Sequence, residues 1–166
     1  SGGGSKGGFQ YSALNYIIKE LGIRYDILCG ISVGALNCAH LSMYSKDKQD
    51  LAIDNLGKVW NTISTPQVRK NWFPFGQLTG LWKESIYNSQ PLADLVHKNL
   101  DLEIIRKSGI KVIVGTVSVT NGNYKCFTQD DDNFIEAVLA SSSYPVGLNP
   151  VTIDGEEFTD GGLKHV

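Results

Sequence analysis

Ser32 is the residue of this chain best placed to act as a nucleophile. It lies in the pattern Gly30-Ile31-Ser32-Val33-Gly34, after a short apolar strand and before the apolar start of a helix. A sharp turn between a strand and a helix raises a serine hydroxyl clear of the backbone and sets it at the positive end of the helix dipole. Glycines on both sides let the strand and the helix approach closely. The alternative is an ordinary glycine-rich turn in which the serine caps the helix.

A glycine-rich loop, Ser1 to Gly8, opens directly into a helix predicted from Phe9 to Leu21. Backbone N–H groups at a helix N-terminus bind anions. Three anions fit this loop: the phosphate of a nucleotide, the phosphate of a lipid head group, and the oxyanion of an acyl-transfer intermediate. Gly2, Gly4 and Gly7 match the spacing of the dinucleotide-binding fingerprint, but its acidic residue, about 20 positions further on, would be Asp26. That residue lies inside the strand that feeds the serine turn, which argues against a dinucleotide.

The serine needs a base to take its proton, and the sequence offers two. Histidine is the usual base, and Ser32, Asp160 and His165 follow the chain order of an α/β-hydrolase triad. In that fold the aspartate and the histidine stand on separate loops, so their short spacing here argues against a triad. Alternatively, the Asp160 carboxylate acts directly, since Gly161 and Gly162 behind it allow close approach. An aspartate before glycine is also common as a plain turn residue.

Hydrophobic periodicity predicts the elements that must position these residues. Helices are expected over residues 9–21, 33–44, 51–63, 91–100 and 134–140, and strands over Lys111–Val119 and Tyr124–Thr128. Asn121-Gly122 predicts a tight hairpin between those two strands, and a second short hairpin through Asp154-Gly155 leads to Asp160. Helices alternate with strands before the hairpins enter, which indicates α/β layers around a mixed sheet.

Prolines and glycines break regular structure between residues 64 and 88. Large apolar side chains gather within this stretch: Trp72, Phe73, Phe75, Leu78, Leu81 and Trp82. Either they form a small satellite core under a long loop, or they form a lid or the wall of an apolar site. The sequence favours neither interpretation.

The composition is that of a globular domain with a single core. The chain has 166 residues, of which 42% are hydrophobic and 19% charged, and its net charge of −2 argues against a nucleic-acid partner. No apolar run reaches the ~18 residues of a membrane span and no signal peptide is visible, so we expect a cytoplasmic protein. The scattered cysteines Cys29, Cys38 and Cys126 predict buried free thiols rather than disulfides.

Three motifs in this order resemble those of the patatin-like phospholipase family: the glycine-rich loop, the Gly-x-Ser-x-Gly turn and Asp160-Gly161-Gly162. The stretch from Ala140 to Gly162 is also similar to the family's segment before its aspartate, so the resemblance covers nearly the whole chain. It implies an α/β fold with three layers, α/β/α, around a mostly parallel, mixed central sheet. It further implies a single domain over residues 1–166, truncated at both ends, because the family's sheet uses chain before the glycine loop and after His165.

The resemblance implies a serine hydrolase that cleaves carboxylic ester bonds of phospholipids or other lipids, without a metal or a cofactor. Its expected partners are a lipid or ester substrate and, transiently, a membrane surface. The residues that the resemblance assigns are Ser32 as nucleophile and Asp160 as base of a Ser-Asp dyad, Gly2, Gly3, Gly4, Lys6, Gly7 and Val33 around the oxyanion, Gly30 and Gly34 at the nucleophile turn, and Gly161 and Gly162 behind the base.

Two other functions stay open at this point. The glycine-rich loop would also suit a module that binds a nucleotide or a phospholipid head group without hydrolysis. The chain would equally suit an inactive, lipid-binding relative of the family. Residues 45–110 carry no motif of the family, so the sequence leaves the choice of substrate open.

Overall fold

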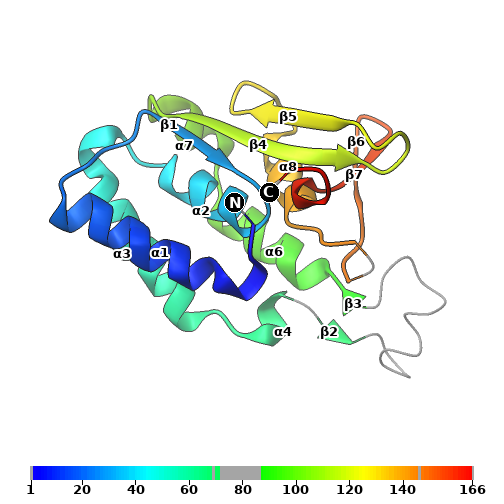
Figure 1. The fold of residues 1–166 in the computed structure, drawn as a ribbon, viewed down its shortest axis with the longest axis horizontal. Coiled ribbons are helices and arrows are strands. Elements are labelled where there is room, and N and C mark those ends of the chain that lie inside the picture. Colours follow the sequence, from blue (N-terminus) through cyan, green and yellow to red (C-terminus); the bar gives the residue numbers. More distant parts are fainter. Residues whose placement is uncertain (1, 69, 72–86, 146, 166) are drawn as a thin grey trace.

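The computed structural model describes residues 2–68, 70–71, 87–145 and 147–165 (Figure 1). Among these residues, a five-stranded sheet forms the centre of the molecule. A two-stranded antiparallel ribbon lies apart from it, formed by β2 (Lys70–Asn71) and β3 (Tyr87–Asn88). The strands of the central sheet are β1 (Ile27–Gly30), β4 (Lys111–Ser118), β5 (Tyr124–Thr128), β6 (Val151–Ile153) and β7 (Glu156–Asp160).

Strand β4 is the hub of the sheet, because β1, β5 and β7 all pair with it. β1 runs parallel to residues 111–114 of β4, β5 runs antiparallel to residues 113–117, and β7 runs antiparallel to residues 116–118. Since β5 occupies one edge of β4, β1 and β7 must share the other edge. They run in opposite directions there, so their carboxyl ends meet on either side of Gly115.

The long helices form where hydrophobic periodicity predicts them. α1 (Gly7–Asn15) continues into a π-helical turn, η2 (Tyr16–Glu20), and Gly22 follows with a φ of 66°. The other long helices are α2 (Val33–Leu41), α3 (Gln49–Thr62), α6 (Gln90–Asn99) and α8 (Phe134–Ser141). Shorter turns complete the described chain: η1 (Gly4–Lys6), η3 (Lys46–Lys48), α4 (Thr65–Val68), α7 (Leu102–Lys107) and η4 (Gly161–Leu163). The short helices α4 and α7 were not predicted.

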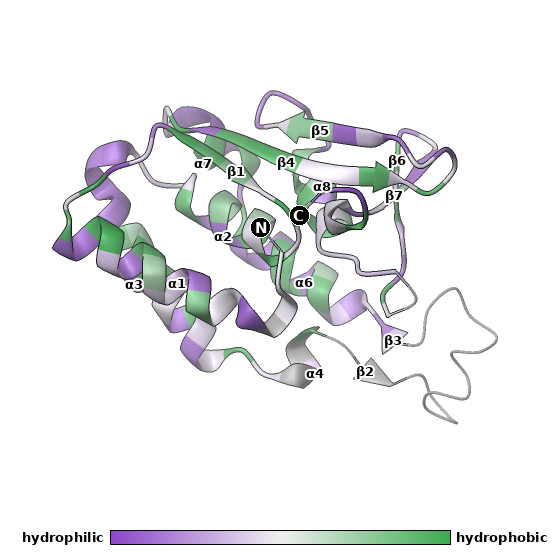
Figure 2. Cartoon of the chain, in the orientation of Figure 1, coloured by the Kyte–Doolittle hydropathy of each residue, from purple (hydrophilic) through white to green (hydrophobic). Residues whose placement is uncertain are grey.

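The core lies between the sheet and the helices α2 and α8, which pack on one of its faces, and α1, α3 and α6 pack on those two helices (Figure 1). Val112 and Val114 of β4 are fully buried there, against Phe134 and Val138 of α8, which are buried as well. Figure 2 shows hydrophobic residues along β1 and the first half of β4. Strand β1, which leads to the nucleophile turn, and its neighbour β4 are therefore packed against the core.

The mixed α/β class and the mixed sheet are confirmed. The balance of the sheet differs from the expectation of mostly parallel strands: β1 and β4 pair in parallel, whereas β4–β5, β4–β7 and β6–β7 are antiparallel. The turn Asp154-Gly155 joins β6 to β7 and residues 119–123 join β4 to β5, and such short connections can link only antiparallel neighbours. The second connection is longer than the tight turn expected at Asn121-Gly122, because Asn121 does not adopt the positive φ that such a turn requires.

Burial alternates along β1, and this pattern corrects the expectation for the thiols. Leu28 and Gly30 face the helices and are buried, whereas Ile27 and Cys29 face outward. Cys29 and Cys126 are both exposed, and only Cys38 on α2 lies partly inside. The prediction of buried thiols is therefore wrong for two of the three, because the described helices cover only the opposite face of the sheet.

Candidate active site

Ser32 occupies a strained turn between β1 and α2. Its backbone angles are φ 57° and ψ −133°, which residues other than glycine rarely adopt. Two hydroxyl groups from the end of α8 hold this turn: Ser141 Oγ accepts from the Ser32 N–H at 2.9 Å, and Ser142 Oγ donates to the Ser32 carbonyl at 3.2 Å. Such strain persists only where the surrounding structure fixes it, and these two bonds supply that support.

The glycines on either side of Ser32 let β1 and α2 nearly touch. A Cβ atom on Gly30 would lie 2.4 Å from the carbonyl oxygen of Gly34, a separation that real Cβ atoms do not show. Any side chain at residue 30 would therefore push the strand and the helix apart. Val33, the first residue of α2, is buried directly behind the serine.

Asp160 ends β7 opposite Thr116 of β4, and it is only 4% exposed. Its Oδ1 atom accepts from the N–H of Gly162 at 2.8 Å, so the turn that follows the aspartate orients its carboxylate. The backbone N–H of Asp160 donates to the carbonyl of Ser143 at 3.1 Å, which ties the end of β7 to the chain after α8.

Ser32 and Asp160 lie in neighbouring parts of the fold, because the carboxyl ends of β1 and β7 meet at the same point of β4. Ile31, directly before the serine, lies beside the turn after the aspartate: a Cβ on Gly161 would lie 3.2 Å from its Cγ2 atom. Ser141 Oγ bridges the two sides, since it binds the Ser32 N–H and donates to the carbonyl of Gly115 at 2.7 Å. Within the described part of the chain, no hydrogen bond joins the Ser32 hydroxyl to the Asp160 carboxylate. Such bonds often tighten only when substrate binds.

His165, the alternative base, lies elsewhere. Its exposed ring packs edge-on against Tyr124, with the ring centroids 4.6 Å apart. The Tyr124 hydroxyl lies over Gly115 on the outward face of the sheet, where it occupies the space of a side chain at residue 115. The contact with Tyr124 thus holds His165 to the face that the long helices leave uncovered.

The glycine-rich loop lies directly against the serine. A Cβ atom on Gly2 would lie 3.0 Å from the Cβ of Ser32 and 3.5 Å from its hydroxyl oxygen. The next two residues adopt backbone angles that favour glycine, with φ of 154° at Gly3 and 53° at Gly4. A backbone without side chains therefore passes the hydroxyl, so its N–H groups can approach a reacting carbonyl.

The end of the loop packs tightly on the helices. A Cβ on Gly7 would lie 2.3 Å from Val33 Cγ2 and 2.4 Å from the ring of Trp60. Lys6 ends η1 with its side chain exposed, and its backbone N–H donates to the carbonyl of Gly3 at 3.0 Å. The structure thus brings the loop, the nucleophile turn and the aspartate to one region, and leaves the Lys6 side chain at its border.

A family model described as patatin-like phospholipase matches residues 1–165. The chain belongs to the patatin-like phospholipase family. Among solved structures, VipD from Legionella pneumophila is similar, with a TM-score of 0.53 and 15% sequence identity over 98% of this chain and 45% of that chain. At this identity the likeness shows the fold alone, and the chain spans less than half of VipD. A search of curated proteins found no match.

Family membership confirms the resemblance drawn from the three motifs. The activity of this family is lipid acyl hydrolysis. The motif residues of this patatin-like phospholipase chain are the ones that the fold gathers around Ser32. No helix in the described ranges combines the length and the apolarity that crossing a bilayer requires. The aromatic stretch from Trp72 to Trp82 lies outside the described residues.

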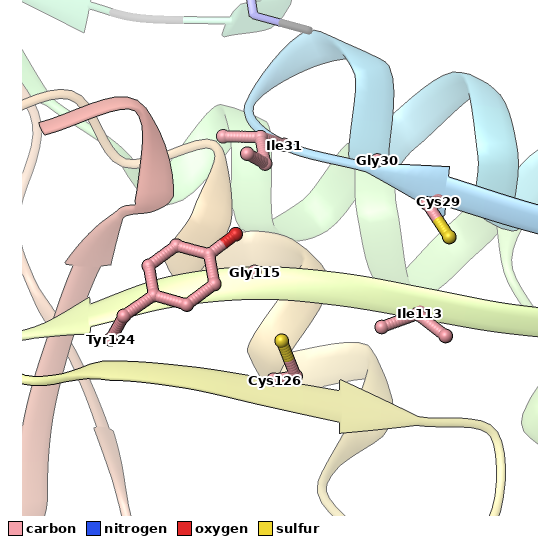
Figure 3. Close-up of a pocket in the computed structure, with 7 residues that line it drawn as sticks. All are labelled: Cys29, Gly30, Ile31, Ile113, Gly115, Tyr124 and Cys126. Carbon is pink, nitrogen blue, oxygen red and sulfur yellow. The ribbon is translucent and has the colours of Figure 1, made fainter. Parts of the chain in front are cut away.

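A pocket of about 410 Å³ lies on the outward face of the sheet, behind the nucleophile turn. Figure 3 shows the thiols of Cys29 and Cys126 and the hydroxyl of Tyr124 around it. Its lining includes Gly30 and Ile31 but neither Ser32 nor Asp160. A second pocket, of about 330 Å³, lies beside the end of β7 and is lined by apolar side chains that include Val117, Leu148 and Leu163.

Sequence reasoning missed the residues that hold the site from a distance. The helix predicted over residues 134–140 stops short of Ser141 and Ser142, yet Ser141 ends α8 and both serines bind the backbone of Ser32. Asn37 of α2 is 2% exposed and binds side chains on two other helices. A polar residue at a buried position of a helix was the one available signal for Asn37, and the serines carried none.

Proposed function

We propose that this chain is a serine lipid acyl hydrolase that cleaves carboxylic ester bonds, with Ser32 as the nucleophile and Asp160 as its base. The observation that carries the proposal is that β1 and β7 end at one point of β4, with the glycine-rich loop beside the serine. The family contributes the reaction class, and the geometry supports the assignment of residues.

In the first step, Asp160 accepts the proton of the Ser32 hydroxyl while the serine oxygen attacks the ester carbonyl carbon. Gly162 orients the carboxylate through Oδ1, which leaves Oδ2 as the oxygen assigned to proton transfer. An aspartate needs no third residue, because it has no tautomer to be fixed. The C–O bond to the leaving alcohol then breaks, and the alcohol takes the proton from Asp160, leaving an acyl-serine.

The negative charge that develops on the carbonyl oxygen needs donors already in place. The N–H groups of Gly3 and Gly4 are the candidates from the loop, and that of Val33 is the candidate from the start of α2. One such donor contributes roughly 10²–10³ in rate. The helix dipole of α2 adds to their effect, because its positive end lies at Ser32.

In the second step, a water molecule gives a proton to Asp160 and its oxygen attacks the carbonyl carbon of the acyl-serine. The bond between this carbon and the Ser32 oxygen then breaks, and Asp160 returns the proton to that oxygen, which frees the fatty acid and restores the Ser32 hydroxyl.

A fluorophosphonate probe tests the proposal most directly, because only an activated serine reacts with it. We expect labelling of the intact chain, loss of labelling in Ser32→Ala, and full labelling in the control Ser45→Ala, whose serine precedes η3. Turnover of p-nitrophenyl butyrate should follow the same pattern. A folded wild-type protein that neither reacts with the probe nor cleaves the ester, but binds a nucleotide in calorimetry, would favour the binding module instead.

A further inference from the structure

Asn37 is a polar residue in an unfavourable place. It lies in the middle of α2, at 2% exposure, where an apolar residue would ordinarily pack. A buried amide costs free energy unless its donors and acceptor are all paired. Asn37 meets this condition through bonds that all lead away from its own helix.

These bonds connect three helices to the glycine-rich loop. Trp60 Nε1 of α3 donates to Asn37 Oδ1 at 3.0 Å, and Asn37 Nδ2 donates to Gln10 Oε1 of α1 at 3.0 Å. Gln10 Nε2 in turn donates to the carbonyl oxygen of Gly2 at 3.3 Å. Asn37 Nδ2 also lies 3.5 Å from the carbonyl of Gly7, at the other end of the loop.

The order of donors fixes the orientation of Gln10. Because Asn37 presents an N–H to the Gln10 side chain, the amide oxygen of Gln10 must face Asn37. Its NH₂ group is then the end that reaches Gly2. The indole N–H of Trp60 fixes Asn37 in the same way, since it can only donate. The amide groups of Gln10 and Asn37 therefore each have one orientation that satisfies all of these hydrogen bonds.

The carbonyl of Gly2 belongs to the same peptide unit as the N–H of Gly3. A peptide unit is planar and trans, so its N–H points opposite to its C=O. A bond that holds the Gly2 carbonyl therefore sets the direction of the Gly3 N–H. At Gly2 and Gly3 themselves, no side chain restrains the backbone, and a glycine backbone samples many conformations.

We propose that Asn37 is a positioning residue for the oxyanion site: through Gln10, it holds the Gly2 carbonyl and so aims the Gly3 N–H. This inference rests on the proposed function. It adds residues that belong to none of the three motifs. The indole of Trp60 supports the loop in two ways. Its N–H orients Asn37, and its ring packs in the space that a side chain at residue 7 would occupy.

The principal test is Gln10→Met, because Gln10 is only partly buried and its loss leaves the helices packed. We expect kcat for p-nitrophenyl butyrate to fall ~10-fold to 100-fold with KM within about twofold, since an oxyanion donor acts in the transition state and not on the bound ester. Asn37→Leu should show the same split. The matched control is Asn55→Leu, which removes a side-chain bond to Tyr44 on the same helical layer and should leave kcat unchanged.

A second readout does not depend on turnover. Amide hydrogen exchange of the peptide that contains Gly2 to Gly8 should become faster in Gln10→Met and in Asn37→Leu, and should stay as in wild type in Asn55→Leu. If Asn37→Leu does not fold, Gln10→Met decides alone. A variant that keeps both wild-type kcat and wild-type exchange would overturn the inference, as would a rise in KM at constant kcat.

The two proposals fail in different ways. If the wild-type chain neither labels with fluorophosphonate nor cleaves the ester, the proposed function is lost, and with it the oxyanion role of the network. If wild type is active and Gln10→Met is equally active with unchanged exchange, the hydrolase proposal stands and only the role of Asn37 is removed.

Discussion

Gly161 packs so closely on Gly115 that a Cβ atom at residue 161 would lie 2.3 Å from the Gly115 carbonyl oxygen. This contact joins the turn after Asp160 to the middle of β4, where β1 and β7 meet. Gly161→Ala should therefore displace the aspartate and reduce stability by about 1–3 kcal/mol, as overpacking does. Urea unfolding measures the loss, and esterase activity should fall with it. Gly8→Ala is the control, because nothing lies within 4 Å of a Cβ there.

The strain at Ser32 gives a prediction in which two inactive variants differ in stability. A glycine adopts φ 57° and ψ −133° more easily than a serine does. Ser32→Gly should therefore be more stable than Ser32→Ala by about 1 kcal/mol, while both variants lose esterase activity. Thermal unfolding compares them. Equal Tm values for the two variants would show that the turn stores no strain.

Exchanging Asp160 for asparagine separates the dyad from the triad. Asparagine keeps an oxygen for the Gly162 N–H but cannot take a proton, so Asp160→Asn should fold normally and lose at least ~10²-fold in kcat. His165→Ala should keep wild-type kcat, because His165 packs on Tyr124. If the two results are exchanged, His165 is the base and the dyad assignment is wrong.

Ser141 should support both the fold and the chemistry. Ser141→Ala removes the acceptor of the Ser32 N–H and the donor to the Gly115 carbonyl, in a site with no exposure. We expect a loss of about 1–3 kcal/mol in urea unfolding and a lower kcat. Ser143→Ala is the matched control just after the same helix, because its hydroxyl donates to the Leu139 carbonyl of α8. A larger effect from Ser143→Ala would contradict this role of Ser141.

His40 on α2 should make stability depend on pH. Burial lowers the pKa of His40 below its ordinary value of 6.5, and its Nε2 atom has no partner in the described structure. The unfolded chain therefore binds a proton at higher pH than the folded one, so stability should fall as pH drops below about 6.5. Urea midpoints between pH 7.5 and 5 measure this. The slope should be smaller in His40→Leu than in wild type.

Much of the fold could be predicted because its signals are local. Periodicity placed the long helices within a few residues but missed the short helices α4 and α7, and the pair Asn121-Gly122 indicated the position of the hairpin between β4 and β5 but not its longer turn. The three glycine motifs identified the family, because each demands a backbone shape that few sequences provide. The site then followed from the order of the motifs along the chain.

The remaining features could not be predicted because they join residues far apart in the sequence. Ser141 and Ser32 are 109 positions apart, and a hydroxyl that binds a backbone N–H leaves no periodic pattern. The exposure of Cys29 depends on which face of the sheet the helices cover, and an apolar strand does not reveal this. For the same reason, the sequence could not show that β1 and β7 share an edge of β4.

That shared edge has a consequence for the spacing of Ser32 and Asp160, the proposed nucleophile and base. β1 is in register with β4 up to Val114, and β7 from Thr116 onward, so the gap between the ends of β1 and β7 is measured along one continuous strand. Deleting a single residue there would draw the two strand ends together by about 3.3 Å and turn the following side chains to the opposite face. The hairpin after β4 and the segment that leads to β6 can change in length without altering this distance. These two segments can thus vary during evolution while the distance between the Ser32 hydroxyl and the Asp160 carboxylate stays constant.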